Sequence, residues 1–87
     1  MPTITRAWTI GTKPIRILIE NPKRTELFVY NAGTATIYLT SSQNLAYTDG
    51  IPIDTTTKSF SSEKCKDEVW CVSASAGQDV RVWEVSE

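Results

Sequence analysis

Apolar and polar residues alternate along the first part of the chain, and this period of two predicts β-strands. Residues 3–10 and 15–20 show the alternation, and a glycine and a proline within residues 11–14 indicate a turn between them. Asn21 and Pro22 end the second segment, because proline cannot donate to a strand ladder. The apolar residues expected to share one face of each segment are Ile4, Trp8 and Ile10, and then Ile15, Ile17 and Ile19.

The next segments predict a central strand followed by a hairpin. Residues 26–30 are apolar on both faces, which indicates a strand covered on each side. Residues 31–34 form a turn in which Gly33 can take a positive φ. Residues 36–40 are β-branched and aromatic, so we expect them to return as the hairpin partner of residues 26–30.

Polar segments separate the remaining strands. Residues 41–49 are small and polar, which predicts an exposed loop. Residues 50–53 indicate a brief edge strand, because Pro52 is tolerated at an edge and not in a central strand. Residues 58–62 predict a weak strand, and residues 63–68 a charged turn.

The last strands complete an all-β pattern. Residues 68–73 and 79–85 are two clear strands, and we expect them to form a C-terminal hairpin. The whole pattern gives about seven or eight short strands, with no helical periodicity. We therefore predict an all-β fold, a small antiparallel β-sandwich or barrel, with residues 1–87 as a single domain. A chain of 87 residues has room for one core and is close to the lower limit for folding alone.

Composition and charge exclude several classes of function. The net charge is −1, and no basic stripe is present, so nucleic acid is not an expected partner. No apolar run approaches the ~20 residues of a membrane-spanning helix. Residues 1–10 lack the pattern of a signal peptide, which predicts synthesis in the cytoplasm.

The chain does not carry the residues that enzyme chemistry needs. It has no histidine, so the usual general base and metal ligand is missing, and no glycine spacing matches a phosphate-binding loop. Glu63, Asp67 and Glu68 gather at one turn beside Lys64 and Lys66, which is typical of a solvated turn. We expect no catalytic residue, no cofactor and no metal.

Cys65 and Cys71 are the two cysteines. Their spacing fits neither a zinc site nor a redox motif. A short turn at residues 66–68 would leave the two side chains badly placed for a bridge, and two reduced thiols are the first expectation. A disulfide within the chain and one to a neighbouring subunit both stay open.

The aromatic residues divide into expected core and expected surface. Phe28, Tyr38 and Trp70 lie inside strands and are predicted core residues. Trp83 alternates with Val80 and Val82 and shares its face with Arg81, so this face is either covered or an interface. Tyr47 lies in the polar loop as a candidate exposed anchor. The candidate interface residues are Trp8, Tyr47, Arg81 and Trp83. Arg16 and Glu20 are expected on a solvated sheet face.

The order of these features resembles small virion proteins of tailed phages. The resemblance covers residues 20–85 and rests on the basic turn before residues 27–31, the Ile-Tyr strand at residues 36–39, the segment at residues 50–53 and the two final strands. In that family a Pro-Gly pair often follows the segment that corresponds to residues 50–53. This chain has residues 54–57 at that place instead. The resemblance implies a compact β-sandwich or barrel of the capsid decoration, cement or head accessory type.

The resemblance also implies partners. The expected partner is the major capsid protein or another virion subunit, the expected location is the virion, and a symmetric homo-oligomer is expected, with a trimer favoured. Residues 1–10 are the candidate arm for strand exchange or lattice binding, because they are terminal and alternate cleanly. Two alternatives remain: a carbohydrate- or surface-binding module using Trp8, Tyr47 and Trp83, and a head-tail or tail accessory protein.

Overall fold

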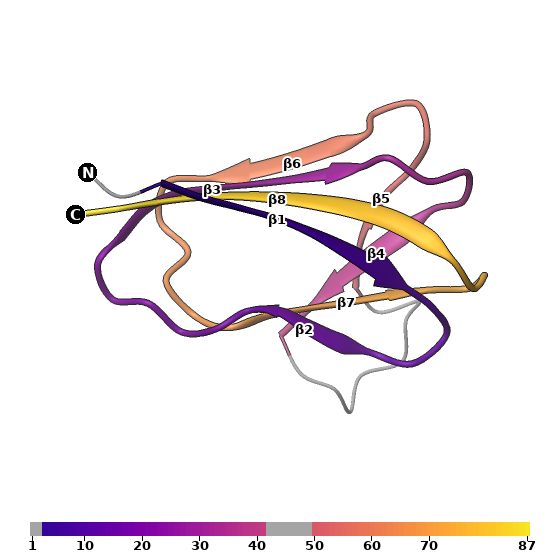
Figure 1. Cartoon of the computed structure of the whole chain (residues 1–87), viewed down its shortest axis with the longest axis horizontal. Coiled ribbons are helices and arrows are strands. Elements are labelled where there is room, and N and C mark those ends of the chain that lie inside the picture. Colours follow the sequence, from indigo (N-terminus) through magenta and orange to yellow (C-terminus); the bar gives the residue numbers. More distant parts are fainter. Residues whose placement is uncertain (1–2, 42–49) are drawn as a thin grey trace.

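The chain folds into two antiparallel sheets of four strands each (Figure 1). The computed structural model describes residues 3–41 and 50–87. Within these residues no helix forms, and so none there has the length and apolar character needed to cross a membrane. The strands are β1 (Thr3–Ile10), β2 (Ile15–Leu18), β3 (Arg24–Asn31), β4 (Ile37–Thr40), β5 (Ile51–Ile53), β6 (Ser59–Ser62), β7 (Val69–Ser73) and β8 (Gln78–Ser86).

The strand order is that of a jelly roll. Sheet A has the order β1-β8-β3-β6, and sheet B has the order β2-β7-β4-β5. Successive strands mostly alternate between the two layers, as in an eight-stranded jelly roll built from two Greek keys. The predicted all-β antiparallel fold is confirmed, and the structure decides for the sandwich over the barrel.

The core lies between the two sheets and takes side chains from both. β3 and β8 supply alternate residues of sheet A, and β4 and β7 face them from sheet B. Burial of this kind contributes about 25 cal/mol for each Å² of apolar surface removed from water. The buried apolar residues are Ile10, Ile17, Leu18, Leu27, Val29, Ile37, Leu39, Ile53, Val69, Cys71, Val80 and Val82.

Both predicted hairpins are wrong. β3 and β4 belong to opposite sheets, and so do β7 and β8. Each connection carries the chain from one layer to the other, and polar side chains hold the crossing. The Asn31 amide donates to the carbonyls of Ala35 and Ile53, each at 2.9 Å. Gln78 Oε1 accepts from the backbone N–H groups of Thr34 at 2.8 Å and Ala35 at 2.9 Å.

Gly33 is required at this crossing for space and not for a positive φ. A Cβ at Gly33 would collide with the Gln78 side chain and would approach the backbone N of Asp79 to 3.2 Å. Among the described residues, the left-handed φ values belong to Lys58 (66°) and Gly77 (74°). The prediction of a turn was correct, but the reason for the glycine was different.

A bulge changes which residues of β2 are buried. The register with β7 shifts between Arg16 and Leu18, so Ile17 and Leu18 are both buried. Ile19, which was predicted to face inward, is 64% exposed. A bulge adds one residue to the strand and so breaks the period of two on which the prediction depended. Arg16 and Glu20 are exposed, as expected.

The predictions for the other strands are confirmed in part. β3 is an inner strand of sheet A, but only its inward face is fully buried, so the expectation of cover on both faces is wrong. Phe28, predicted as core, and Tyr30 are half-buried on the outward face. β5, which contains Pro52, is an edge strand of sheet B, as predicted. Ile4 shares the face of Ile10 but is 43% exposed.

A buried ion pair joins β3 to β8 at one end of sheet A. The side chain of Arg24 is fully buried, and its Nε donates to Glu84 Oε2 at 2.6 Å. Nη1 donates to the carbonyls of Cys65 at 3.1 Å and Asp67 at 3.0 Å, and Nη2 donates to the carbonyl of Ile19 at 2.7 Å. Four of the five guanidinium N–H groups are therefore satisfied. These bonds tie the end of β2 and the β6–β7 connection to sheet A.

We predict that Arg24→Ala lowers the free energy of unfolding by about 3–5 kcal/mol, because it leaves the Glu84 carboxylate buried without its partner. Urea unfolding measures the change. Arg16→Ala is the matched control, since the Arg16–Glu68 pair at 3.3 Å is roughly half exposed and should contribute less than about 1 kcal/mol. Equal losses for the two variants would show that the buried pair does not stabilise the fold.

Candidate functional site

The outward face of β8 carries two of the predicted interface residues. Val80, Val82 and Glu84 point into the molecule, while Arg81 and Trp83 point outward from the same strand. Trp83 is 45% exposed and Arg81 is also exposed. The alternation that separates them from the core follows from the strand period of two.

The neighbouring strands place further side chains beside these two. β8 pairs with β1 on one side and with β3 on the other, and the register aligns their outward residues. We call the surface made by Phe28, Tyr30, Arg81 and Trp83 the aromatic face. Two cross-strand rows result: Thr5, Trp83 and Phe28 in one, and Ala7, Arg81 and Tyr30 in the other.

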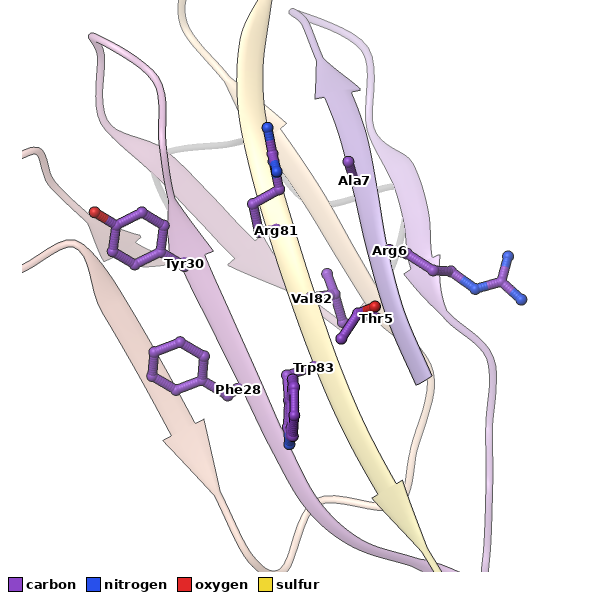
Figure 2. A pocket seen from close by; sticks show the side chains of 8 residues that line it. All are labelled: Thr5, Arg6, Ala7, Phe28, Tyr30, Arg81, Val82 and Trp83. Atoms are coloured by element: carbon purple, nitrogen blue, oxygen red, sulfur yellow. The ribbon is translucent and has the colours of Figure 1, made fainter. Parts of the chain in front are cut away.

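A hollow of about 430 Å³ opens over the aromatic face. Figure 2 shows the rings of Phe28 and Tyr30 face-on beside β3, and the indole of Trp83 edge-on on β8. Arg6 points away from the hollow in the same view. Thr5 and Ala7 are small and leave the β1 side of the hollow shallow. The result is a broad apolar surface on which the Trp83 indole is seen edge-on, unlike the other two rings.

An ion pair next to the rings supplies the polar edge of this surface. Arg81 Nε donates to Asp79 Oδ1 at 2.9 Å, and Nη2 donates to Oδ2 at 2.8 Å. These hydrogen bonds hold the pKa of Asp79 below its usual range, and Asp79 in turn raises the pKa of Arg81. Both groups are charged at neutral pH, so their charges compensate each other and the face has little net charge.

The chemistry of the aromatic face is that of binding by contact. No group of three or more metal-ligating side chains occurs in residues 3–41 and 50–87. The aromatic face offers flat rings, aliphatic surface and a compensated ion pair, which are means of binding by contact. Rings of this kind stack on apolar side chains of a protein or on the faces of sugar rings.

The structure brings together only part of the predicted site. Arg81 and Trp83 lie side by side on the aromatic face, as their shared periodicity predicted. Trp8 lies on the other side of its sheet, packed against the core, and its buried Nε1 has no hydrogen-bond partner among the described residues. Tyr47 lies outside the described residues. Phe28 and Tyr30 were missed, although their alternation with the buried Leu27 and Val29 was a signal for them.

The two cysteines are free thiols in different surroundings. Cys71 is fully buried in β7, and this burial raises the pKa of its thiol to about 12. Cys65 is half-buried in the β6–β7 connection and packs against the edge of the core. The two positions therefore differ in access to solvent and to another molecule.

Comparison with known proteins shows the fold and no family. No protein-family model matches the sequence, and no curated protein matches it significantly. A solved structure from Bacillus endospore appendages, which form a novel family of disulfide-linked pili, is similar to this chain with a TM-score of 0.55 and 17% sequence identity. The match covers 98% of this chain and 85% of the other. At this identity the likeness shows the fold alone.

We predict that a maleimide at about pH 8 modifies Cys65 in the folded protein and leaves Cys71 unmodified. The thiolate is the reactive form, and a pKa of about 12 leaves only about one Cys71 thiol in ten thousand ionised at that pH. Mass spectrometry of Cys65→Ser and Cys71→Ser measures the two sites separately, and both should react in urea. Comparable rates in the folded variants would contradict the burial of Cys71.

Proposed function

We propose that this chain is a non-enzymatic structural subunit of a virion, of the capsid decoration type, and that it attaches through the aromatic face. The partner is the major capsid protein or another virion subunit. The observation that carries the proposal is Trp83, an indole 45% exposed on an inner strand of a sheet, beside two half-buried rings of the next strand.

The residue types of the aromatic face support a protein partner. Tryptophan, tyrosine and arginine dominate the few residues that carry most of the binding energy at interfaces. Because the charges of Arg81 and Asp79 compensate each other, a partner surface that covers this pair needs no strong opposite charge. A single exposed Trp83, with its neighbours already held by the sheet, can therefore act as an ordered anchor.

The size of the face favours attachment in several copies. The whole outward side of sheet A, which contains the aromatic face, has four strands about 4.8 Å apart and up to nine residues long, and so covers at most on the order of 500 Å². A stable protein–protein interface buries about 800 Å² on each partner. One copy should therefore bind weakly, while a symmetric set of copies on a repeating shell gains through effective concentration. The trimer implied by the resemblance would meet this need.

Two further observations are consistent with this role. The jelly roll occurs in viral capsid domains and also in lectin domains. The similar structure from Bacillus endospore appendages belongs to pili, which are repeating assemblies. The resemblance to small virion proteins of tailed phages directs the proposal to capsid decoration within this wider class.

A carbohydrate-binding module is the alternative that the aromatic face also supports. The flat presentation of Phe28 and Tyr30 in Figure 2 suits a sugar ring. Of the two described residues among those first assigned to such a module, Trp83 lies on this face and Trp8 is packed against the core. A change of tryptophan fluorescence on addition of a glycan, lost in Trp83→Ala, would favour this function.

We predict that gold-labelled antibodies against the purified protein bind to the heads of tailed-phage particles. The particles are those induced from the organism that carries the gene. Purified protein should also co-sediment with heads stripped of it. Trp83→Ala should weaken co-sedimentation by about 30-fold, since an anchor of this kind contributes about 2 kcal/mol. Ile51→Ala is the control, because Ile51 is 52% exposed on the other sheet.

Labelling confined to other structures, or wild-type affinity in Trp83→Ala, would contradict capsid attachment through this face. The light-scattering mass of the purified protein, with and without reductant, tests the trimer. A fall in mass on adding reductant would show a disulfide between subunits, for which Cys65 is the accessible thiol.

A further inference from the structure

The four edge strands of the sandwich differ in how well they are protected against pairing. β2 has four residues and a bulge, and β5 has three residues including Pro52. β6 has four residues, and the N–H of Ser59 is occupied by the carbonyl of Thr57 at 2.9 Å. Short length, bulges, prolines and charged side chains are among the features by which proteins prevent edge-to-edge pairing.

β1 carries only the last of these features, the charged side chain of Arg6. It is eight residues long, its register with β8 is unbroken from Thr3 to Ile10, and it contains no proline. It is the last strand of sheet A, so none of the described strands pairs with its second edge within the sheet (Figure 1). Among the strands that the structure describes, β1 therefore presents the longest regular edge.

Hydrogen bonds elsewhere in the sheet fix which groups of β1 face this edge. The N–H of Ala32 donates to the carbonyl of Asp79, and the N–H of Asn31 donates to that of Lys58. Tyr30 and Phe28 therefore bond to Arg81 and Trp83 across the β3–β8 ladder, because backbone groups alternate along each strand. The backbone N–H and C=O groups of Val80 and Val82 consequently point toward β1.

On β1 itself, the partners of Val80 and Val82 are Trp8 and Arg6, whose N–H and C=O groups point to β8. The backbone groups of the residues between them point the other way, because these groups alternate along a strand. The residues whose backbone groups face the open edge are Thr3, Thr5, Ala7 and Thr9.

We infer that β1 pairs antiparallel with β1 of a second copy of this chain, across a two-fold axis, and so joins two copies of sheet A into one continuous sheet. An open edge of this length is a template for strand addition. The inference does not depend on the proposed function. β1 lies within residues 1–10, the candidate arm for strand exchange or lattice binding, and in this pairing it would remain in its own sheet.

The edge of β1 favours a closed pair of copies over an open-ended filament. A two-fold contact uses the same edge on both molecules, so it consumes both β1 edges at once. The edges left at the ends of the joined sheet are the two β6 strands, where the N–H of Ser59 is already occupied. The association therefore ends at pairs of copies and does not extend into a filament.

Arg6 restricts the register of this pairing. Pairing centred on Arg6, with Thr3 opposite Thr9, would place Arg6 opposite Arg6 of the second copy in a non-hydrogen-bonded pair, where side chains are closest. Like charges directly opposite each other are destabilising. The pairing is then centred on Thr5 or on Ala7, where small side chains face their own copies.

The same two-fold axis, normal to the sheet, keeps the outward faces of both copies on one side. The two aromatic faces would lie next to each other, joined by the small outward side chains of Thr5 and Ala7. The pair thus presents twice the area of one face. If trimers form through other surfaces, the β1 contact would link one trimer to the next.

Proline substitutions test the pairing, because proline removes a single N–H. In Thr5→Pro and Ala7→Pro the lost N–H faces the open edge, so the mass at equilibrium should fall to half the wild-type value. Thr5→Val keeps the N–H and should retain the wild-type mass. Sedimentation equilibrium up to about 1 mM protein detects even weak association.

Arg6→Pro is the matched control, since its N–H belongs to the β1–β8 ladder. It should lower the melting temperature, whereas Thr5→Pro should keep it close to wild type. Amide hydrogen exchange of the wild-type protein gives a test without variants: the Thr5 and Ala7 amides should become protected as concentration rises. A wild-type monomer throughout the range would overturn the inference. So would exchange at Thr5 and Ala7 that does not change with concentration.

Discussion

The ion pair between Arg24 and Glu84 holds together the end of the sandwich on which the other contacts depend. One guanidinium binds β8 through a carboxylate, and through three carbonyls it also binds the end of β2 and the β6–β7 connection. A charge buried in this way is stabilising only while its partners are present. Arg24 therefore makes the correct arrangement of four chain segments a condition for folding.

At the other end of the sheet, neutral amides perform the corresponding task. Asn31 and Gln78 hold the crossing between β3 and β4 through backbone groups of that connection. Glu84 and Gln78 thus fix β8 at both ends, and the residues between them alternate between core and surface. The aromatic face is a product of this arrangement, because the order of Arg81 and Trp83 depends on the position of β8.

The sequence predicts the local structure of this protein better than its long-range connections. Strand periodicity is a property of neighbouring residues, so the outward position of Trp83 and the edge position of Pro52 could be found without a structure. The choice of sheet at each turn depends on partners such as Gln78 for residues 34 and 35, more than forty positions away. The burial of Arg24 likewise depends on Glu84, and a bulge exposes Ile19 in a way that no alternation indicates.

The pairing of Thr3 with Val85 has a mechanical consequence. The β1–β8 ladder runs from this pair to Ile10 opposite Gln78, and the free ends of both strands lie at the same end of the molecule (Figure 1). Tension between Thr3 and Val85 would load the ladder one pair at a time, as in a zipper, and not all pairs together in shear. A subunit held by its sheet faces would therefore resist stretching far better than one pulled at that end.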